Sequence, residues 1–434
     1  MVQNIKNINL LLVVIIMFCA KITIGQLTTT NLPPYNSPQH LIENVLLGKG
    51  VTAFNFQVYG APIQYGFFSG GATSIGLDSG LVLNCEDINQ LTIPPGLGGL
   101  IPNVGGNSGS FGPNSMGTAT NNDLLSVANS VPGLIGQSFT VSSVNDAAVM
   151  EFDFVPLSDT IEFRYVFGSD EYTTFINTQY NDVFAFFLSG PGITGPYTSP
   201  PGFPGGSINL AVVPNSFPPL PITISTVQPG LNGAYYISNM PSLNVGLNGY
   251  TTVLTAKSAV TACDTFHIRL AVGDGTDHSL QSAVFLEAGS FNLGFDLGDD
   301  FLLANNTAIC GNELNLTANI AATSYQWLKD GVIIPGATNQ TYTANLGDGT
   351  YSCNITDANG CIGNDDVFLE FVTASLVNPL IPVFQLCDAD GNLTENFNLT
   401  IKETEILGGQ SPVDFEVEYF SDINYINQIL FSCN

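Results

Sequence analysis

Acidic and amide side chains stand at several points where a strand-like run of residues meets a turn. They are Asp170, Glu171, Asn181, Asp182, Asp274 and Asp277. Carboxylate and amide oxygens that converge from loops at one edge of a β-sandwich suit a hard cation such as Ca²⁺, which takes about six to eight oxygen ligands. The sequence therefore predicts a ligand-binding or calcium site formed by these residues. The alternative is that they only cap turns and accept hydrogen bonds from backbone N–H groups.

Glu287 stands in an otherwise apolar strand-like run, Ala283–Phe291. A carboxylate in such a place needs a partner, because burying an unpaired charge is costly. We expect that partner to be Arg164, Arg269 or a metal ion.

A second candidate for calcium follows Cys387. Oxygen-bearing side chains alternate there, at Asp388, Asp390 and Asn392. The spacing is similar to the start of a calcium-binding loop, but a full EF-hand-type loop would have its glycine one place later than Gly391 and a glutamate at its twelfth position. The segment is therefore predicted to be a turn first and a calcium site second.

Signatures of catalysis are weak in this sequence. The three histidines, His40, His267 and His278, lack the spacing of a metal-binding pair. There is no Gly-x-Ser-x-Gly elbow, no phosphate-binding loop and no dinucleotide-binding fingerprint. A glycoside hydrolase needs only two carboxylates about 5 to 10 Å apart, so the acidic residues leave that activity open. We nevertheless predict a protein that is not an enzyme.

The elements that would position these residues have the patterns of β-strands. Apolar residues alternate with polar ones through Met150–Phe154 and again, after a turn, through Ile161–Phe167, which predicts an antiparallel hairpin with one wet face. The run Val183–Leu188 is apolar on both faces and is expected to be a central strand. Further strands are predicted over Phe266–Val272 and Ser282–Phe291. Because no long segment repeats with the period of a helix, residues 26–295 are predicted to form a large, jelly-roll-like β-sandwich.

Two stretches rich in Gly and Pro interrupt the predicted sandwich, at residues 94–117 and 190–206. Both are expected to be long loops on its rim, where recognition surfaces often lie. The alternative is that they are flexible filler.

The composition limits what the protein can bind. Lys and Arg total 8 against 36 Asp and Glu, which gives a formal charge of −28, yet 44% of the residues are hydrophobic and 10% are charged. A disordered acidic tail would need low hydrophobicity and dense charge, so this chain should fold. So few cations cannot neutralise many phosphates, which excludes nucleic-acid binding as the main activity. The 45 Gly, 25 Pro, 29 Phe and 15 Tyr favour an all-β chain.

Residues 1–25 have the layout of a secretory signal peptide. Lys6 precedes the apolar run Ile8–Ala20, and small or polar residues follow as far as Gln26. The run is shorter than the roughly 20 residues that a membrane-spanning helix needs, so the mature chain should contain no transmembrane helix. We therefore expect a protein that is secreted or attached to the outer cell surface. An uncleaved N-terminal anchor is the alternative.

Residues 305–372 carry a second pattern of ordered cysteine and aromatic residues. Those residues are Cys310, Trp327, Tyr351 and Cys353. The pattern resembles a short immunoglobulin-like sandwich, which implies that the tryptophan packs on a disulfide between the sheets and that the tyrosine hydroxyl closes a corner. Cys361 competes with Cys353 as the disulfide partner of Cys310, and the sequence does not choose between them.

The last segment, residues 376–434, has the pattern of a partial third β domain. It contains a strand-like run at Phe415–Phe420 and ends one residue after Cys433. About 60 residues can form only a thin core, so we expect this domain to be truncated.

Ordered blocks across the large sandwich resemble a known family. They are His40–Gly48, Gly66–Gly71, Leu77–Leu83, Phe163–Tyr172, Asn181–Gly192 and Ala283–Phe291. They look like the choice-of-anchor L domain, which occurs at the head of large exported proteins of Bacteroidetes-type bacteria, and the resemblance covers roughly residues 40–295. It implies a cell-surface location, immunoglobulin-like repeats after the domain, and a C-terminal anchoring or secretion signal that is often of the type IX kind. The sequence shows no such terminal signal, so attachment is an inference.

The large sandwich is therefore predicted to act as a non-enzymatic, adhesin-like module at the cell surface. Its loops would recognise an extracellular glycan or a surface protein, and the immunoglobulin-like unit would serve as a spacer. Ca²⁺ is the cofactor that the sequence suggests. The runner-up hypothesis is a structural component of a matrix or filament without a specific ligand, and a carboxylate-dependent glycoside hydrolase is the third.

Overall fold

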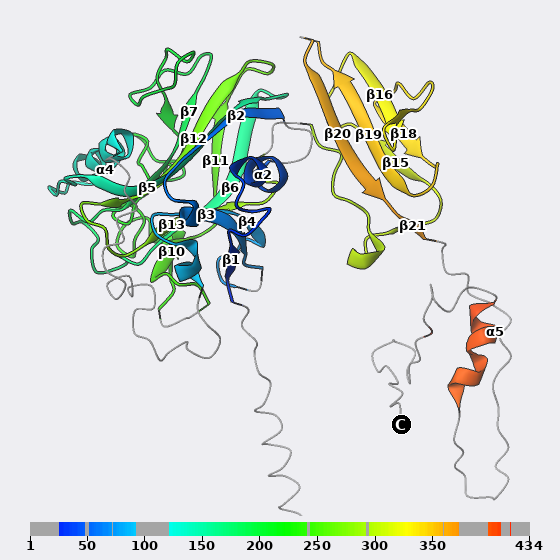
Figure 1. Cartoon of the computed structure of the whole chain (residues 1–434), viewed down its shortest axis with the longest axis horizontal. Coiled ribbons are helices and arrows are strands. Elements are labelled where there is room, and N and C mark those ends of the chain that lie inside the picture. Colours follow the sequence, from blue (N-terminus) through cyan, green and yellow to red (C-terminus); the bar gives the residue numbers. More distant parts are fainter. Residues whose placement is uncertain are drawn as a thin grey trace, which may run out of the picture. The chain divides into compact units, whose positions relative to one another are not determined.

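The computed structural model describes residues 26–47, 52–71, 73–92, 121–240, 244–291, 295–358, 360–372, 398–408 and 417. These residues form mainly antiparallel β-sheets with few helices, which confirms the all-β prediction (Figure 1). The expected signal peptide, the loop at 94–117 and the candidate calcium loop with Asp388, Asp390 and Asn392 lie outside the described residues.

One sheet of the large sandwich, called the β6 sheet below, has eight strands. Its order is β1 (Thr28–Thr30), β3 (Tyr65–Ser69), β4 (Ser79–Asn84), β13 (Ser282–Glu287), β6 (Thr160–Ser169), β10 (Gly249–Thr251) and β9 (Tyr236–Ser238), and β11 (Leu254–Ala259) also pairs with β6. Side chains alternate along β6, because Ile161 and Phe163 are buried whereas Glu162 and Arg164 are exposed. The expected solvent-exposed face of this strand is confirmed.

The other sheet, called the β12 sheet below, has five strands. Its order is β2 (Thr52–Tyr59), β5 (Val144–Val155), β12 (Phe266–Gly275), β7 (Val183–Ser189) and β8 (Ile208–Asn209). Every residue of β7 is buried, and the strand lies between β12 and β8. The prediction of an interior strand at this position is therefore confirmed.

Aromatic rings from both sheets fill the space between them. Phe163 of β6 contacts Phe186 of β7, with ring centroids 4.9 Å apart. The ring centroid of Phe291, which follows β13, lies 5.4 Å from that of Phe154 of β5 and 5.0 Å from that of Phe163. Burying one such side chain is worth about 1.5–3 kcal/mol, so this core is the main source of stability for the sandwich.

The predicted hairpin between Met150–Phe154 and Ile161–Phe167 is wrong. β5 pairs with β2 and β12, whereas β6 pairs with β13, β10 and β11. The chain passes from one sheet to the other at the turn between β5 and β6, so their apolar faces meet across the core. Alternation identifies a strand and its buried face, but it does not identify the partner strand.

A helix that the sequence analysis did not predict packs on the outer face of the β12 sheet. α4 (Asn122–Leu134) begins after Asn121, whose side-chain oxygen accepts a hydrogen bond from the Leu124 backbone N–H at 3.0 Å. Leu124, Val127 and Val131 are fully buried. Leu124 and Val127 share one apolar cluster with residues of β5, β7 and β12. The spacing of the three buried residues, three and four positions, is the helical period. The segment is too short to form the long helical repeat that would distinguish it from the strands around it.

The other helical segments are short. They are α2 (Pro38–Leu41), η1 (Ile42–Leu46), η2 (Pro62–Gln64), η3 (Ile88–Leu91), η5 (Gly233–Tyr235), η6 (Leu303–Asn305), η7 (Leu399–Lys402) and α5 (Glu403–Leu407). Within the described ranges, none of the helices combines the length and the apolar character that crossing a membrane requires.

The remaining strands lie between residues 309 and 372. They are β14 (Ile309–Cys310), β15 (Leu314–Thr317), β16 (Ser324–Lys329), β17 (Val332–Ile333), β18 (Thr341–Ala344), β19 (Gly349–Thr356), β20 (Ile362–Leu369) and β21 (Phe371–Val372). Trp327 is fully buried, its indole Nε1 donates to the backbone oxygen of Asn339 at 2.9 Å, and its ring stacks on Tyr342. Tyr351 is also fully buried. An immunoglobulin-like fold for this region stays a prediction.

The chain divides into two compact units. The first comprises the described residues up to Gly298, Thr317–Tyr342 and Tyr351–Asp366. The second comprises Asp299–Leu316, Thr343–Thr350 and the described residues from Val367 onward. Every site described below lies in the first unit, and the domain limits expected from the sequence stay predictions.

Candidate functional site

Several strand ends of the large sandwich bring the predicted acidic residues together. Asp170 and Glu171 directly follow β6, Asn181 and Asp182 directly precede β7, and Asp274 lies near the end of β12. We call these residues the acidic cluster. They are far apart in the sequence, and the two sheets together place them at one edge of the sandwich.

Asp182 links the two sheets within this cluster. Its backbone N–H donates to Glu171 Oε2 at 3.4 Å. Its Oδ1 accepts a hydrogen bond from the Gly275 N–H of β12 at 2.8 Å, and its Oδ2 accepts one from the Ser282 hydroxyl of β13 at 2.7 Å. One carboxylate therefore bridges a strand of the β12 sheet and a strand of the β6 sheet.

Asp170, Asn181 and Asp274 lack such partners. Their side-chain oxygens accept no hydrogen bond of ordinary geometry from the protein, although these residues are only 2%, 0% and 0% exposed. The Gln281 side chain near Asp170 and the Cys85 thiol near Asp274 favour the charged carboxylates without reaching that geometry. A buried polar group without a partner costs about 1–3 kcal/mol, and a charged one costs more. Among the described residues, the acidic cluster therefore lacks the hydrogen-bond donors that its buried oxygens need.

Burial controls the protonation of the acidic cluster. It raises the pKa values of Asp170, Glu171 and Asp274 well above their usual range, and the charge of Asp182 adds to that increase. Burial also raises the pKa of Asp182 to about 8, although the hydrogen bonds that its carboxylate accepts oppose the shift. These groups therefore retain protons near neutral pH unless a positive charge lies beside them.

The Lys and Arg side chains in the described part of the chain are engaged elsewhere. Every Lys and Arg among the described residues forms an ion pair with a carboxylate outside the acidic cluster. The pairs are Arg164–Glu287, Lys257–Glu162, Arg269–Asp123, Lys329–Asp330 and Lys402–Glu405. In the described part of the chain, no Lys or Arg neutralises the cluster.

Two of the predicted residues lie outside the acidic cluster. Asp277 is half-buried beside it, and its Oδ1 accepts a hydrogen bond from the Ser279 N–H at 3.3 Å, as a turn-capping residue does. Glu287 forms an ion pair with Arg164 at 2.7 Å, which is one of the partners expected for it. Glu287 therefore has a cationic partner, and Asp277 has one turn-capping hydrogen bond.

Glu86 is an acidic neighbour that the sequence analysis missed. It follows β4 closely and is buried. Burial, followed by the charge of Asp146, raises its pKa to about 7. Its own charge raises the pKa values of Asp170 and Asp274. The available signal was a carboxylate just after an apolar strand, which is the pattern that identified Asp170.

A groove of about 780 Å³ opens on the outer face of the β12 sheet. Gln57 of β2, Glu151 of β5 and Arg269 of β12 are cross-strand neighbours that line it. Tyr59, which is 52% exposed, and the loop residues 198–201 also line it. The Gly- and Pro-rich loop at 190–206 thus contributes to a concave surface, and the sequence analysis identified none of the other lining residues.

One ion pair holds the walls of this groove together. Arg269 pairs with Asp123 of α4, and its guanidinium carbon lies 4.5 Å from the centre of the Phe187 ring. Asp123 Oδ1 also accepts a hydrogen bond from the Thr198 N–H at 3.1 Å. Sheet, helix and loop are therefore tied to the same carboxylate.

Tyr59 presents a protonated hydroxyl in the groove. Partial burial, followed by the charge of Glu151, raises the pKa of Tyr59. The hydroxyl donates a hydrogen bond to Gln57 Oε1 at 2.8 Å. The groove therefore offers an exposed aromatic ring beside several hydrogen-bonding groups.

His267 lies on the same outer face between two carboxylates. Its Nδ1 is 2.7 Å from Asp153 Oδ1, and its Nε2 is 3.5 Å from Glu151 Oε2. Asn55 Nδ2 donates a further hydrogen bond to Asp153 Oδ2 at 2.7 Å. The acidic residues on this face thus have basic or amide partners.

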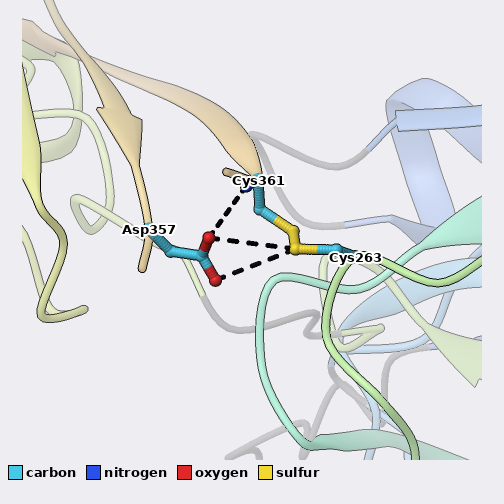
Figure 2. A group of neighbouring side chains, drawn as sticks. All are labelled: Cys263, Asp357 and Cys361. Carbon is cyan, nitrogen blue, oxygen red and sulfur yellow. Dashed lines mark hydrogen bonds between the residues drawn. A yellow bond between two sulfur atoms is a disulfide. The ribbon is translucent and has the colours of Figure 1, made fainter. Parts of the chain in front are cut away.

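A disulfide joins Cys263, between β11 and β12, to Cys361, directly before β20 (Figure 2). Their Cα atoms are 5.4 Å apart, a usual separation for this bond. Among the cysteines that the structure describes, Cys85, Cys310 and Cys353 form no disulfide with one another. The structure therefore pairs Cys361 with neither cysteine of the immunoglobulin-like pattern, because the chain fold places Cys263, which that pattern does not include, beside it.

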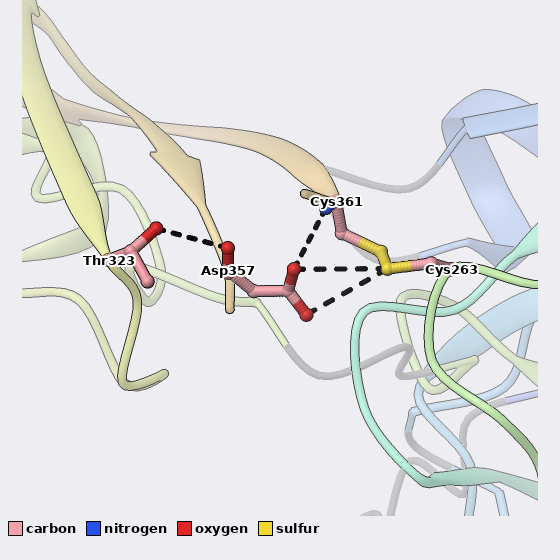
Figure 3. The surroundings of a disulfide bond; sticks show 4 residues. All are labelled: Cys263, Thr323, Asp357 and Cys361. Carbon is pink, nitrogen blue, oxygen red and sulfur yellow. Dashed lines mark hydrogen bonds between the residues drawn. A yellow bond between two sulfur atoms is a disulfide. The ribbon is translucent and has the colours of Figure 1, made fainter. Parts of the chain in front are cut away.

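Asp357 lies next to this disulfide (Figure 3). Its carboxylate oxygens are 3.8 and 3.9 Å from Cys263 Sγ, and Oδ1 accepts a hydrogen bond from the Cys361 N–H at 2.8 Å. The Thr323 hydroxyl donates to the Asp357 backbone oxygen at 3.0 Å. Among the described residues, this is where three potential metal-ligand atoms of His, Cys, Asp or Glu come within 4.8 Å of one another. Two of those atoms are bonded disulfide sulfurs, whereas cysteine binds metals as the thiolate.

Comparison with known families shows that one family model covers almost the whole large sandwich. Residues 28–292 match the family model described as the Choice-of-anchor L domain. No curated protein matches the chain. The matched range contains both the acidic cluster and the groove.

Proposed function

Because the chain belongs to the choice-of-anchor L domain family, which marks extracellular or cell-surface proteins, we propose that its large sandwich binds an extracellular glycan in the groove of the β12 sheet. In this proposal the protein is an adhesin-like module. The observation that supports it is the concave outer face with Tyr59 exposed beside a row of polar side chains.

The chemistry of the groove suits a polyhydroxylated ligand. A sugar carries both donors and acceptors, and Gln57 and Asn121 in the groove offer both kinds of group. Arg269 offers donors and Glu151 offers acceptors. The Tyr59 ring supplies a flat apolar surface for the C–H groups of the sugar. The volume of about 780 Å³ is within the range of small-molecule sites.

A binding role fits the chain better than hydrolysis. The family is not an enzyme family. Asp170, Glu171 and Asp182 lie close together but are at most 2% exposed, so a sugar chain would not reach them. In the groove, Asp123 is engaged with Arg269. We infer that the carboxylates of this domain have structural or ligand-positioning roles.

A glycan array probed with the exported chain tests the proposal. We expect binding to a restricted set of glycans, and Tyr59→Ala should weaken it roughly tenfold or more, because exposed aromatic side chains often carry much of the binding energy. Phe217→Ala is the matched control, since Phe217 is 97% exposed and does not line the groove. Equal binding by the Tyr59→Ala protein would contradict the proposed site. An array without signal from any glycan would favour the structural matrix hypothesis.

A further inference from the structure

The acidic cluster shares no residue with the groove, and its features need a separate explanation. Strand ends from both sheets meet there, and the carboxylate of Asp182 already bridges β12 and β13 through hydrogen bonds. The side chains of Asp170, Asn181 and Asp274 are buried beside it without hydrogen bonds of ordinary geometry. Acceptors are therefore present in excess of donors.

The Lys and Arg residues that the structure describes do not balance this excess of acceptors. The Lys and Arg residues of the described ranges all pair with other carboxylates. His278, which follows β12, is also paired with another carboxylate, because its Nδ1 lies 2.6 Å from Asp146 Oδ2. The carboxylates of Asp170 and Asp274 have no such pairing. Several buried carboxylates without a counter-charge can persist only if they are protonated or if a cation from solution joins them.

The donor set determines which cation fits. Carboxylate and amide oxygens bind hard cations, and a flexible set of such ligands from separate strands suits Ca²⁺ better than Mg²⁺, which demands a stricter octahedral arrangement. Cys85 is the sulfur nearby, but its Sγ accepts a hydrogen bond from the Ser282 N–H at 2.9 Å. Burial also raises the pKa of the Cys85 thiol, so the thiolate that soft metals require is disfavoured.

We infer that the acidic cluster is a divalent-cation site of the calcium class, in which Asp274, Asn181 and Glu171 supply oxygen ligands around Asp182. Asp170 adds negative charge from the adjoining strand end. The described carboxylates lie too far apart for any three to bring oxygens within 4.8 Å of one another. The ion would draw them inward and would join the β6 sheet to the β12 sheet at this edge.

Calcium binding to the intact chain tests this inference. The exported protein is dialysed against EDTA at pH 8 and then titrated with CaCl₂ alone. We expect one ion to bind in the large sandwich by equilibrium dialysis. We also expect the melting temperature to rise by roughly 5–10 °C at a hundredfold excess over the dissociation constant. MgCl₂ at the same concentration should give a smaller rise.

Asp274→Asn is the decisive variant. It replaces a proposed carboxylate ligand with a neutral amide and so removes a buried charge, and most of the calcium-induced rise in melting temperature should therefore be lost. The metal-free variant should melt no lower than the metal-free parent. Asp159→Asn is the matched control, because Asp159 is exposed in the turn between β5 and β6. This control should retain the full response.

Two results would overturn the inference. One is a parent protein whose melting temperature and calcium content do not change on titration. The other is an Asp274→Asn protein that keeps the whole response, because calcium would then bind elsewhere in the chain. If Asp274→Asn does not fold, Asp170→Asn replaces it, and it should reduce the affinity for calcium without lowering the metal-free melting temperature.

Discussion

The carboxylates of the acidic cluster differ from those on the outer face of the β12 sheet in the partners that they have. At the groove, Asp123 pairs with Arg269, and on the same outer face of the β12 sheet Asp153 is held by His267 and Asn55. In the cluster, the carboxylates of Asp170 and Asp274 have no Lys or Arg partner among the described residues and accept no hydrogen bond of ordinary geometry. Both sets are buried, so the difference lies in their partners and not in their exposure.

This difference shows how a chain with few cations distributes them. The sequence has 8 Lys and Arg for 36 Asp and Glu. A basic side chain that pairs with one acid is not available to another. Within the described residues, we therefore expect the buried carboxylates of the acidic cluster to be neutralised by protons or by a cation from solution. The groove is therefore expected to be insensitive to chelators, whereas the cluster should respond strongly to pH and to divalent cations.

The largest expected effect is a loss of stability of the metal-free protein as the pH rises. The folded-state pKa of Asp182 is about 8 and that of Glu86 is about 7, both above the values of unfolded carboxyl groups, so the folded state binds these protons more tightly. The contribution is fully present below about pH 4 and is lost as the pH rises through 8. Urea unfolding in EDTA should show a decrease of several kcal/mol between pH 5 and pH 9.

The Asp182→Asn protein provides the control for this pH series. It lacks the titrating carboxyl group and should show a flatter profile, whereas saturating CaCl₂ should flatten the profile of the parent. A parent profile that is flat in EDTA would mean that the two regions do not differ in their need for a counter-charge.

Arg269→Met should have the next largest effect, about 3 kcal/mol of lost stability, because it leaves the buried carboxylate of Asp123 without a cation. Arg164→Met is the matched control. The Arg164 and Glu287 side chains are 49% and 21% exposed, so their ion pair is worth less than about 1 kcal/mol. Urea unfolding of both variants measures the contrast. Equal losses would show that the pairing in the groove is no stronger than a surface ion pair.

The smallest expected effect is that of His267→Leu. It removes one partner of Asp153, but Asn55 still donates to the other oxygen of that carboxylate. The loss should be about 1–2 kcal/mol. Combining it with Asp153→Leu should recover part of this loss, because the unsatisfied carboxylate is then absent, and thermal unfolding of the single and double variants checks this. A double variant less stable than the sum of both single losses would contradict the pairing.

The sequence predicted the fold class and individual strands, but not their pairing. The alternating residues of β6 and the apolar run of β7 identified both strands and their buried faces. The partners of β5 and β6 could not be read in this way, because a turn between two strands is compatible with a hairpin and with a crossing between sheets. α4 was missed because its apolar period extends over only 13 residues.

The candidate sites were predictable to different degrees for a physical reason. Asp170, Glu171, Asn181 and Asp182 are adjacent to apolar strands, so a local pattern reveals them. The groove is formed by residues such as Gln57 and Arg269, which become neighbours only through the pairing of β2, β5 and β12. Cys263 was likewise hidden as the partner of Cys361, because the two lie 98 positions apart.

The bond between Cys263 and Cys361 also determines how tension would travel along the polypeptide. If the two ends of the chain are pulled apart, the disulfide carries the force directly from Cys263 to Cys361. The covalent chain between the two cysteines, which includes β12 and β13, is then not stretched. That closed covalent ring could not lengthen until the bond is reduced, even if its strands came apart. A reductant should therefore add a distinct extension, of roughly 3.3–3.6 Å for each residue released, to the mechanical unfolding of this protein.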